Sequence, residues 1–234
     1  MNKQGKLSDK IIKFNGGLHI EAKLPDGIQA MNPFKDEHSK LINKLTGIFY
    51  NKYYNDNDPR KLILGINPGR LGAGLTGIPF TDTKRLTNDC GIKIDEISSH
   101  EPSSVFVYEV IRAYGGPELF YKEFFINSIC PLGFIQERSM GKWVNYNYYD
   151  RKDLEESVIP FILKTLKQQI SIGMKTDKVW IMGSGKNYKF IKALNKEHKL
   201  FGELIALDHP RFVMQYRYKK IGEYVERYLK LLDA

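Results

Sequence analysis

Four short apolar runs, each rich in β-branched or aromatic residues, constrain the fold of this chain more than any other feature. They are "KLILGIN" (61–67), "KEFFINSIC" (122–130), "DKVWIMGS" (177–184) and "GELIALD" (202–208). Three of them lack a clean alternation of apolar and polar residues, as expected of parallel strands buried on both faces. Because helical patterns lie between them, the sequence predicts an α/β fold, a three-layer α-β-α sandwich with a central, mainly parallel four-stranded sheet.

Three segments have the spacing of amphipathic helices. "NPFKDEHSKLINKLTGIFYNKYY" (32–54) begins with an Asn cap followed by Pro, which predicts a helix start there. In "RKDLEESVIPFILKTLKQQI" (151–170), Pro160 predicts a kink or a late start. "YKKIGEYVERYLKLL" (218–232) carries a single apolar stripe, and we expect it to close the fold as a C-terminal helix.

The length and composition favour one domain. With 42% hydrophobic residues, a chain of 234 residues can bury one good core, so we expect residues 1–234 to form a single domain. Residues 1–30 are interpreted as an N-terminal extension of unknown role. The segment "QERSMGKWVNYNYY" (136–149) is predicted to be an aromatic, polar loop.

The charge balance points to polyanionic partners. Thirty-six Lys and Arg residues against 27 Asp and Glu residues give a formal net charge of +9. Such an excess favours nucleic acid, because Lys and Arg neutralise phosphates, although a merely basic protein has the same balance. Basic residues alternate with aromatic ones in "RFVMQYRYKK" (211–220), as in a groove that grips phosphates and stacks bases. We expect DNA, single-stranded or duplex, as the partner of a monomer.

Metal, cofactor and membrane signals are missing. Cys90 and Cys130 lie far apart with no second thiol or paired His beside them, so the sequence predicts two reduced structural thiols, no metal and no cofactor. No apolar stretch approaches the ~20 residues of a membrane span, and the N-terminus lacks an apolar signal region. We therefore expect a cytoplasmic protein, associated with the nucleoid when acting, and no membrane partner.

The predicted strands all end in unusual segments. In an open α/β sheet, ligands bind beyond the carboxyl ends of the strands, so "GINPG", "NSICPL", "MGSGKN" and "LDHPR" should converge there. Asn67 and His209 should then face one cleft. "GSGK" is not a phosphate-binding P-loop, because Lys186 is followed by Asn187 rather than Ser or Thr. The helix after it can still hold one backbone phosphate.

At these positions the chain resembles a known family. "GINPGRLGAGLTGIPF" (65–80) looks like the first motif of the uracil-DNA glycosylase superfamily, in particular its single-strand-selective monofunctional branch. "NSICPLGF" (127–134), "MGSGKNYKF" (182–190) and "LDHPR" (207–211) are similar to the later motifs and occur in the same order. The resemblance implies a monofunctional DNA glycosylase that flips out uracil or a related damaged base and hydrolyses its N-glycosidic bond.

The resemblance also implies roles for single residues. Asn67 would hold the attacking water, His209 would donate to the departing base, and Phe80 would stack on that base. The implied base-binding residues are Gly65, Ile66, Pro68, Gly69, Thr76, Phe80, Asn127 and Ser128. The implied DNA-binding residues are Gly183, Ser184, Gly185, Lys186, Pro210, Arg211 and Phe212. The glycines of the first motif are expected to let backbone approach the base and sugar.

Two departures from the family pattern leave alternatives open. The spacing from Asn127 to Cys130 is one residue longer than the family's, so either Asn127 or Ser128 reads the base. "HPRFV" replaces the usual final loop, which makes Arg211 and Phe212 the candidates for a rebuilt wedge. A nucleic-acid-binding module that has lost turnover, and a hydrolase of nucleosides or nucleotides, are the competing hypotheses. Considered one at a time, Asn67 and His209 are also typical turn or loop residues, and Phe80 is also typical of a hydrophobic core.

Overall fold

The computed structural model describes residues 5–233 and confirms the predicted parallel sheet. Its four strands are hydrogen-bonded in the order β3-β2-β6-β7, and all are parallel. They are β2 (Arg60–Gly65), β3 (Phe124–Ser128), β6 (Met174–Met182) and β7 (Glu203–Leu207). Every residue of β3 is buried, as is expected where helices cover both faces of a sheet.

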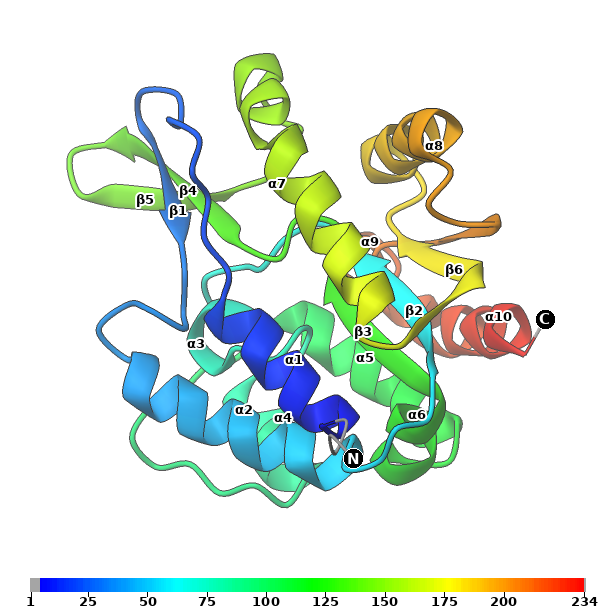
Figure 1. Ribbon diagram of the computed structural model, residues 1–234. Helices are drawn as coiled ribbons and strands as arrows, with labels where there is room; N and C mark the ends of the chain where they lie inside the picture. The colour runs from blue at the N-terminus through cyan, green and yellow to red at the C-terminus, as the bar shows by residue number, and fades with distance from the viewer. Residues whose placement is uncertain (1–4, 234) are drawn as a thin grey trace.

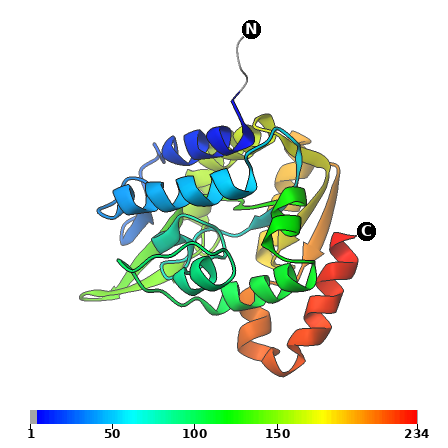
Figure 2. The same cartoon turned by 90° about the horizontal axis from the view of Figure 1, so that it is seen from below.

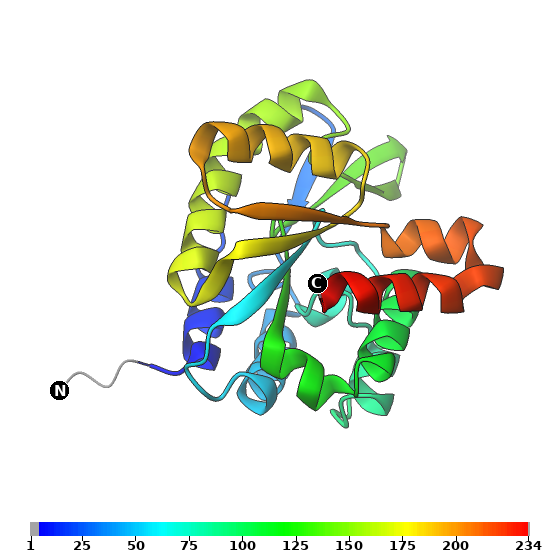
Figure 3. The ribbon, with the colours of Figure 1, turned by 90° about the vertical axis from the view of Figure 1, so that its right-hand side faces the viewer.

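Helices cover the sheet on both faces, which gives the three predicted layers (Figure 1, Figure 3). One face packs against α7 (Lys152–Ser171) and α8 (Lys186–His198). The other is covered by α5 (Pro102–Ala113), α6 (Pro117–Glu123) and α10 (Ile221–Leu232). Between β7 and α10 lie α9 (Pro210–Tyr216), which packs on α5, and a 3₁₀ turn, η1 (Tyr218–Lys220).

The predicted C-terminal helix is confirmed as α10. Tyr228 and Leu232 on its apolar stripe are buried, and Ile221, Val225 and Leu229 pack partly against the core. The indole of Trp180, on β6, is fully buried and donates a hydrogen bond of 2.7 Å to the backbone oxygen of Leu231. The last helix is thereby fixed to the central sheet.

The loop predicted for residues 136–149 is wrong, because this segment is largely a β-hairpin. Strands β4 (Gly133–Ser139) and β5 (Lys142–Tyr146) pair antiparallel, and β1 (Ile28–Met31) pairs with β4 on its other side. Gly141 makes the turn at φ +73°, a conformation that favours glycine. The polar composition that suggested a loop belongs to the exposed part of the hairpin, whose tip carries the fully exposed Met140.

Residues 5–31, most of the segment interpreted as an N-terminal extension, are packed against the rest of the described chain. Helix α1 (Leu7–Gly16) runs alongside α2 (Ser39–Tyr53), as Figure 2 shows. It buries Leu7, Ile11 and Phe14, while residues 28–31 supply β1. Apolar residues at helical spacing in 7–14 are the signal that the interpretation overlooked.

Two further helix predictions need correction. Helix α2 begins at Ser39 and not at Asn32, whose side-chain oxygen accepts from Phe34 N in a tight turn (3.2 Å). A side chain that satisfies nearby backbone suits a turn as well as a helix start. Pro160 marks no late start, because α7 begins at Lys152 and continues through the proline to Ser171, while the alternative of a kink stays a prediction.

Three further features complete the description of the fold. Two short helices, α3 (Ala73–Thr76) and α4 (Thr83–Asn88), follow β2. Both cysteines are free and buried, as predicted. In residues 5–233, no helix has the length and apolar character needed to traverse a bilayer.

Candidate active site at the carboxyl edge of the parallel sheet

A cavity of about 500 Å³ opens where three of the four parallel strands end. The segments after β2 (residues 66–69), β6 (183–187) and β7 (208, 209, 211 and 212) line it, as the sequence predicts for an open α/β sheet. The segment after β3 does not reach it. That side is instead formed by the end of the hairpin and the residues after it, Asn145, Asn147 and Tyr149. Asn67 and His209 therefore lie in one pocket, from strands far apart in sequence.

The amide of Asn67 is held by the backbone at the end of β5 and just after it. Its Nδ2 donates to the oxygen of Tyr146 (3.2 Å), and its Oδ1 accepts from the nitrogen of Tyr148 (3.2 Å). An amide oxygen has two lone pairs, so Oδ1 retains one acceptor site for a water molecule. Asn67 is thus oriented before any ligand binds.

The imidazole of His209 is neutral near pH 7. Burial, and then the positive charge of Arg211, lower the pKa of His209 to about 4. Its Nδ1 accepts a hydrogen bond from Arg211 N (3.1 Å), which caps α9 and assigns the remaining proton to Nε2. His209 therefore offers a neutral Nε2–H donor.

Phe80 lies beside His209 with its ring partly buried. The two ring centroids are 6.2 Å apart, and both rings line the cavity. Phe80 adopts a left-handed backbone conformation (φ 52°), which is unusual for an aromatic residue. Buried Thr76 supports this turn, because its hydroxyl donates to the oxygen of Thr81 (2.6 Å). Thr76 itself does not line the cavity.

The glycines of the first motif mostly accommodate other protein groups, contrary to the expectation that they approach a base. A Cβ on Gly65 would lie 2.9 Å from Cε2 of Phe80, so the strand end leaves room for that ring. A Cβ on Gly72 would lie 2.1 Å from Oε2 of Glu101. Of the predicted base-binding residues, Ile66, Pro68, Gly69 and Phe80 line the cavity, and Gly65 does not.

Neither candidate for reading the base reaches the main cavity. Asn127 is only 6% exposed, and its Oδ1 accepts from Ser128 N (2.8 Å). Asn127 lines a second, narrow cavity of about 10 Å³. Pro68 lines both cavities and stands between the second cavity and the main one. Ser128 is 4% exposed and lines neither.

The predicted DNA-binding residues surround the cavity, with one exception. Gly183, Ser184, Gly185 and Lys186 line it at the start of α8, and Arg211 and Phe212 line it from the first turn of α9. Pro210 is buried and does not line the cavity. The segment expected to be a final loop is thus a helix, and Phe212 lies in an exposed aromatic group with Tyr216 (ring centroids 5.8 Å apart).

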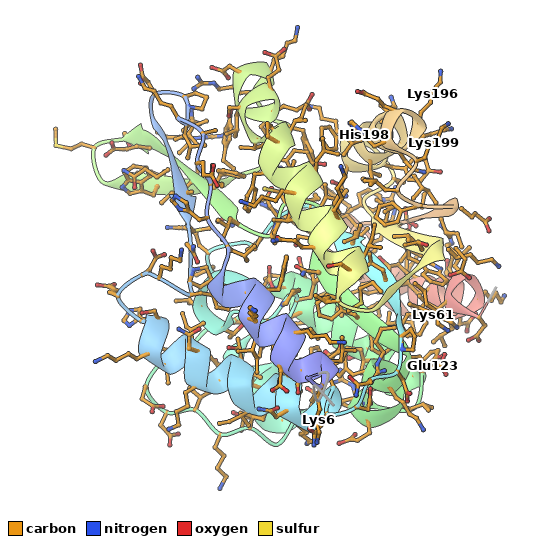
Figure 4. All side chains as sticks on the ribbon, in the orientation of Figure 1. Lys6, Lys61, Glu123, Lys196, His198 and Lys199 are labelled. Carbon is orange, nitrogen blue, oxygen red and sulfur yellow. The ribbon has the colours of Figure 1, made fainter. Side chains whose placement is uncertain are left out.

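A basic surface extends from the cavity along α8. Lys186 lies at its start, with Nζ 6.0 Å from the ring centroid of Tyr149. Lys196 and Lys199 lie at the other end of the helix, at the outer edge of the molecule (Figure 4). The exposed side chains of Lys189 and Lys192 lie between them.

Sequence reasoning missed several residues of the site. Asn145, Asn147 and Tyr149 belong to the segment predicted to be a loop; the β-prone residues Trp143, Val144 and Tyr146 were the available signal. The Oδ1 of Asn145 accepts from Arg70 N (3.0 Å) and so ties the first motif to the hairpin. Glu101 also lines the cavity; burial and then nearby Asp82 raise the pKa of its carboxyl to about 7. Its position directly before α5 gave no functional signal.

Comparisons with known proteins found similarity over most of the chain. Residues 51–233 match the model of the Uracil DNA glycosylase superfamily. The crystal structure of wild-type Pedobacter heparinus SMUG2 is similar over 97% of both chains, with 48% sequence identity and a TM-score of 0.94. No curated protein is significantly similar to this chain in sequence.

Proposed function

Because this chain belongs to the uracil-DNA glycosylase superfamily, we propose that it excises uracil from DNA by flipping the nucleotide into the main cavity and hydrolysing its N-glycosidic bond. The chain is a DNA glycosylase of the hydrolase class, and DNA is its substrate. The observation that carries the finer proposal is that Asn67, Phe80 and a neutral His209 share one cavity.

His209 stabilises the departing base in this proposal. As the bond between C1′ and the base breaks, the electron pair leaves with the base and negative charge grows on its oxygen. A neutral imidazole can donate its Nε2–H to that oxygen while its Nδ1 accepts from Arg211 N. Removal of one such donor costs about 10²–10³ in rate in enzymes with an oxyanion hole.

Asn67 positions the water that attacks C1′. Its amide is already fixed by Tyr146 and Tyr148, so little orientation is lost when a water binds. Phe80 stacks on the flipped base, which contributes ~1–3 kcal/mol but tolerates any base. Asn127 or Ser128 supplies the base selectivity, and either one requires the wall formed by Pro68 to shift when the nucleotide enters.

DNA distortion is assigned to the first turn of α9. Flipping a base out of a duplex costs a few kcal/mol, and a wedge and phosphate contacts must offset that cost. Arg211 and Phe212 are exposed at the rim of the cavity and supply a charge and an aromatic ring. Lys186 and the residues of 183–185 supply phosphate contacts. The protein acts as a monomer in this proposal, because one chain contributes all of these groups.

Alkaline cleavage after incubation with a uracil-containing oligonucleotide tests the proposal. We expect strand breaks at uracil and nowhere else, in single-stranded DNA or in a duplex with a U:G pair. An oligonucleotide with thymine at the same position is the matched control. Failure to release uracil from either substrate would argue against the proposal, and release from deoxyuridine as fast as from DNA would indicate a nucleoside hydrolase instead.

A further inference from the structure

The main cavity contains an acidic group that the steps above do not use. Within residues 5–233, two acidic side chains line the cavity, Glu101 and Asp208. Asp208 is already paired, since its Oδ2 lies 3.1 Å from Nη1 of Arg227. The Oε2 atom of Glu101 is shielded from solvent and has no hydrogen-bond partner in the described part of the chain. Such an oxygen is costly to bury unless a proton, a water or a substrate satisfies it.

Packing holds this carboxyl against the loop that carries Asn67. Glu101 directly precedes α5, and its backbone nitrogen donates to Oδ2 of the buried Asp82 (2.9 Å). Its two carboxyl oxygens lie over the turn at residues 69–72. A Cβ on Gly69 would be 3.5 Å from Oε1, and one on Gly72 would be 2.1 Å from Oε2. The absence of a side chain at position 72 therefore leaves room for Oε2 over this turn.

The charges around Glu101 are few. Burial raises the pKa of Glu101 most, and the nearby Asp82 raises it further. Arg211 lowers this pKa by a smaller amount. Arg85 and His100 face Asp82 rather than Glu101, at 3.7 and 3.6 Å from its Oδ2. His209 carries no charge at neutral pH. With a pKa of about 7, Glu101 exchanges a proton in the range where a general base is most effective.

We propose that Glu101 is the general base of the reaction and accepts a proton from the water held by Asn67. This inference rests on the proposed glycosylase function. The oxygen of the water forms a bond to C1′ as the bond from C1′ to the base breaks. The bonding electrons leave with the base, stabilised by His209, and the proton of the water passes to a carboxylate oxygen of Glu101. Deprotonation to solvent then restores the enzyme.

A pH profile of the single-turnover rate separates this role from a structural one. The substrate is a single-stranded oligonucleotide containing uracil, and the variants are Glu101→Gln and, as a matched control at the other acidic residue, Asp208→Asn. We expect the wild-type rate to rise with pH through about 7, since only the carboxylate accepts a proton. Above that pH the Glu101→Gln variant should react about tenfold more slowly or worse, and its rate should not rise with pH. The Asp208→Asn variant should keep the rise of the rate with pH.

Binding and folding measurements distinguish the loss of a base from the loss of the fold or of DNA affinity. The Glu101→Gln variant should unfold cooperatively and bind a uracil-free oligonucleotide about as well as the wild type at about pH 8. A variant that keeps the wild-type pH profile, or that changes only DNA affinity, overturns the base assignment while the glycosylase activity stands. No uracil release by the wild type at any pH contradicts the proposed function itself.

Discussion

At the scale of single residues, burial shifts two pocket groups in opposite directions. It disfavours the charged form of each, so the pKa of His209 falls to about 4 and the pKa of Glu101 rises to about 7. Between these values His209 is neutral and offers a constant donor. Glu101 alone of the two changes protonation in the neutral range, so one pocket holds a neutral donor and a proton acceptor.

The same shift predicts a pH-dependent effect of Glu101 on stability. Its pKa in the folded protein lies above its ordinary value of 4.5, so the stability it contributes is present below about pH 4.5 and is lost as pH rises through about 7. Glu101→Gln removes this loss. Thermal unfolding should therefore show a larger gain in Tm for the variant at about pH 8 than at about pH 4.5. An equal difference in Tm at both values would mean that the carboxyl is not buried as described.

Gly65 is predicted to control the position of Phe80. In Gly65→Ala, the new methyl group would lie 2.9 Å from the ring, so the ring must shift or the strand end must move. Overpacking of this kind costs about 1–3 kcal/mol. We expect a lower Tm and slower uracil release. Gly47→Ala in α2, where a Cβ meets no atom within 4 Å, is the control and should leave the release rate unchanged; equal behaviour of the two variants would refute the role of Gly65.

At the scale of elements, the hairpin and α9 build the walls that the strand ends alone do not. The hairpin and the residues after it orient Asn67 through Tyr146 and Tyr148 and contact Arg70 through Asn145. Helix α9 begins at Pro210, which places Arg211 in its first, exposed turn. Both elements were misjudged from the sequence. Trp143 and Val144 interrupt the alternation of apolar and polar residues in β5, and "HPR" was interpreted as a loop although Pro210 stands at the first position of a short helix.

Replacement of Arg211 tests the proposed wedge. Arg211→Ala removes an exposed charge and stem at the rim of the cavity. Flipping a base out of a duplex requires free energy for unstacking and unpairing, whereas flipping a base in a single strand requires much less. The variant should therefore slow uracil release from duplex DNA more than from single-stranded DNA. The ratio of the two single-turnover rates is the measurement. Arg138→Ala is a matched control, since Arg138 is exposed on β4 and does not line the cavity; an unchanged ratio in Arg211→Ala would remove the wedge assignment.

At the scale of the whole molecule, the sequence predicted the architecture better than the details of the pocket. Long apolar runs identify buried parallel strands, and the rule that ligands bind at their carboxyl ends brought Asn67 and His209 together correctly. The positions of Asn127 and Glu101 were beyond sequence reasoning, because side-chain direction and burial depend on packing between distant elements. Residues from Leu7 to Leu232 share one hydrophobic core, which supports our proposal that the chain is a single domain.

The net charge of +9 also acts at this scale. The basic face of α8 extends from the cavity rim at Lys186 to Lys199, which supplies the electrostatic surface that DNA phosphates require. Such contacts govern affinity, whereas the groups inside the cavity govern the chemical step. Binding and catalysis should therefore respond to different substitutions.

The most direct test of the central claim is the single-turnover rate of uracil release by the wild type, Asn67→Ala and His209→Ala, with DNA affinity measured in parallel. Each side chain is expected to stabilise the transition state from within one cavity, so each variant should release uracil about tenfold more slowly or worse, with little change in affinity. A full wild-type rate in either variant would contradict the role given to that residue, and a full rate in both would contradict the account of the site.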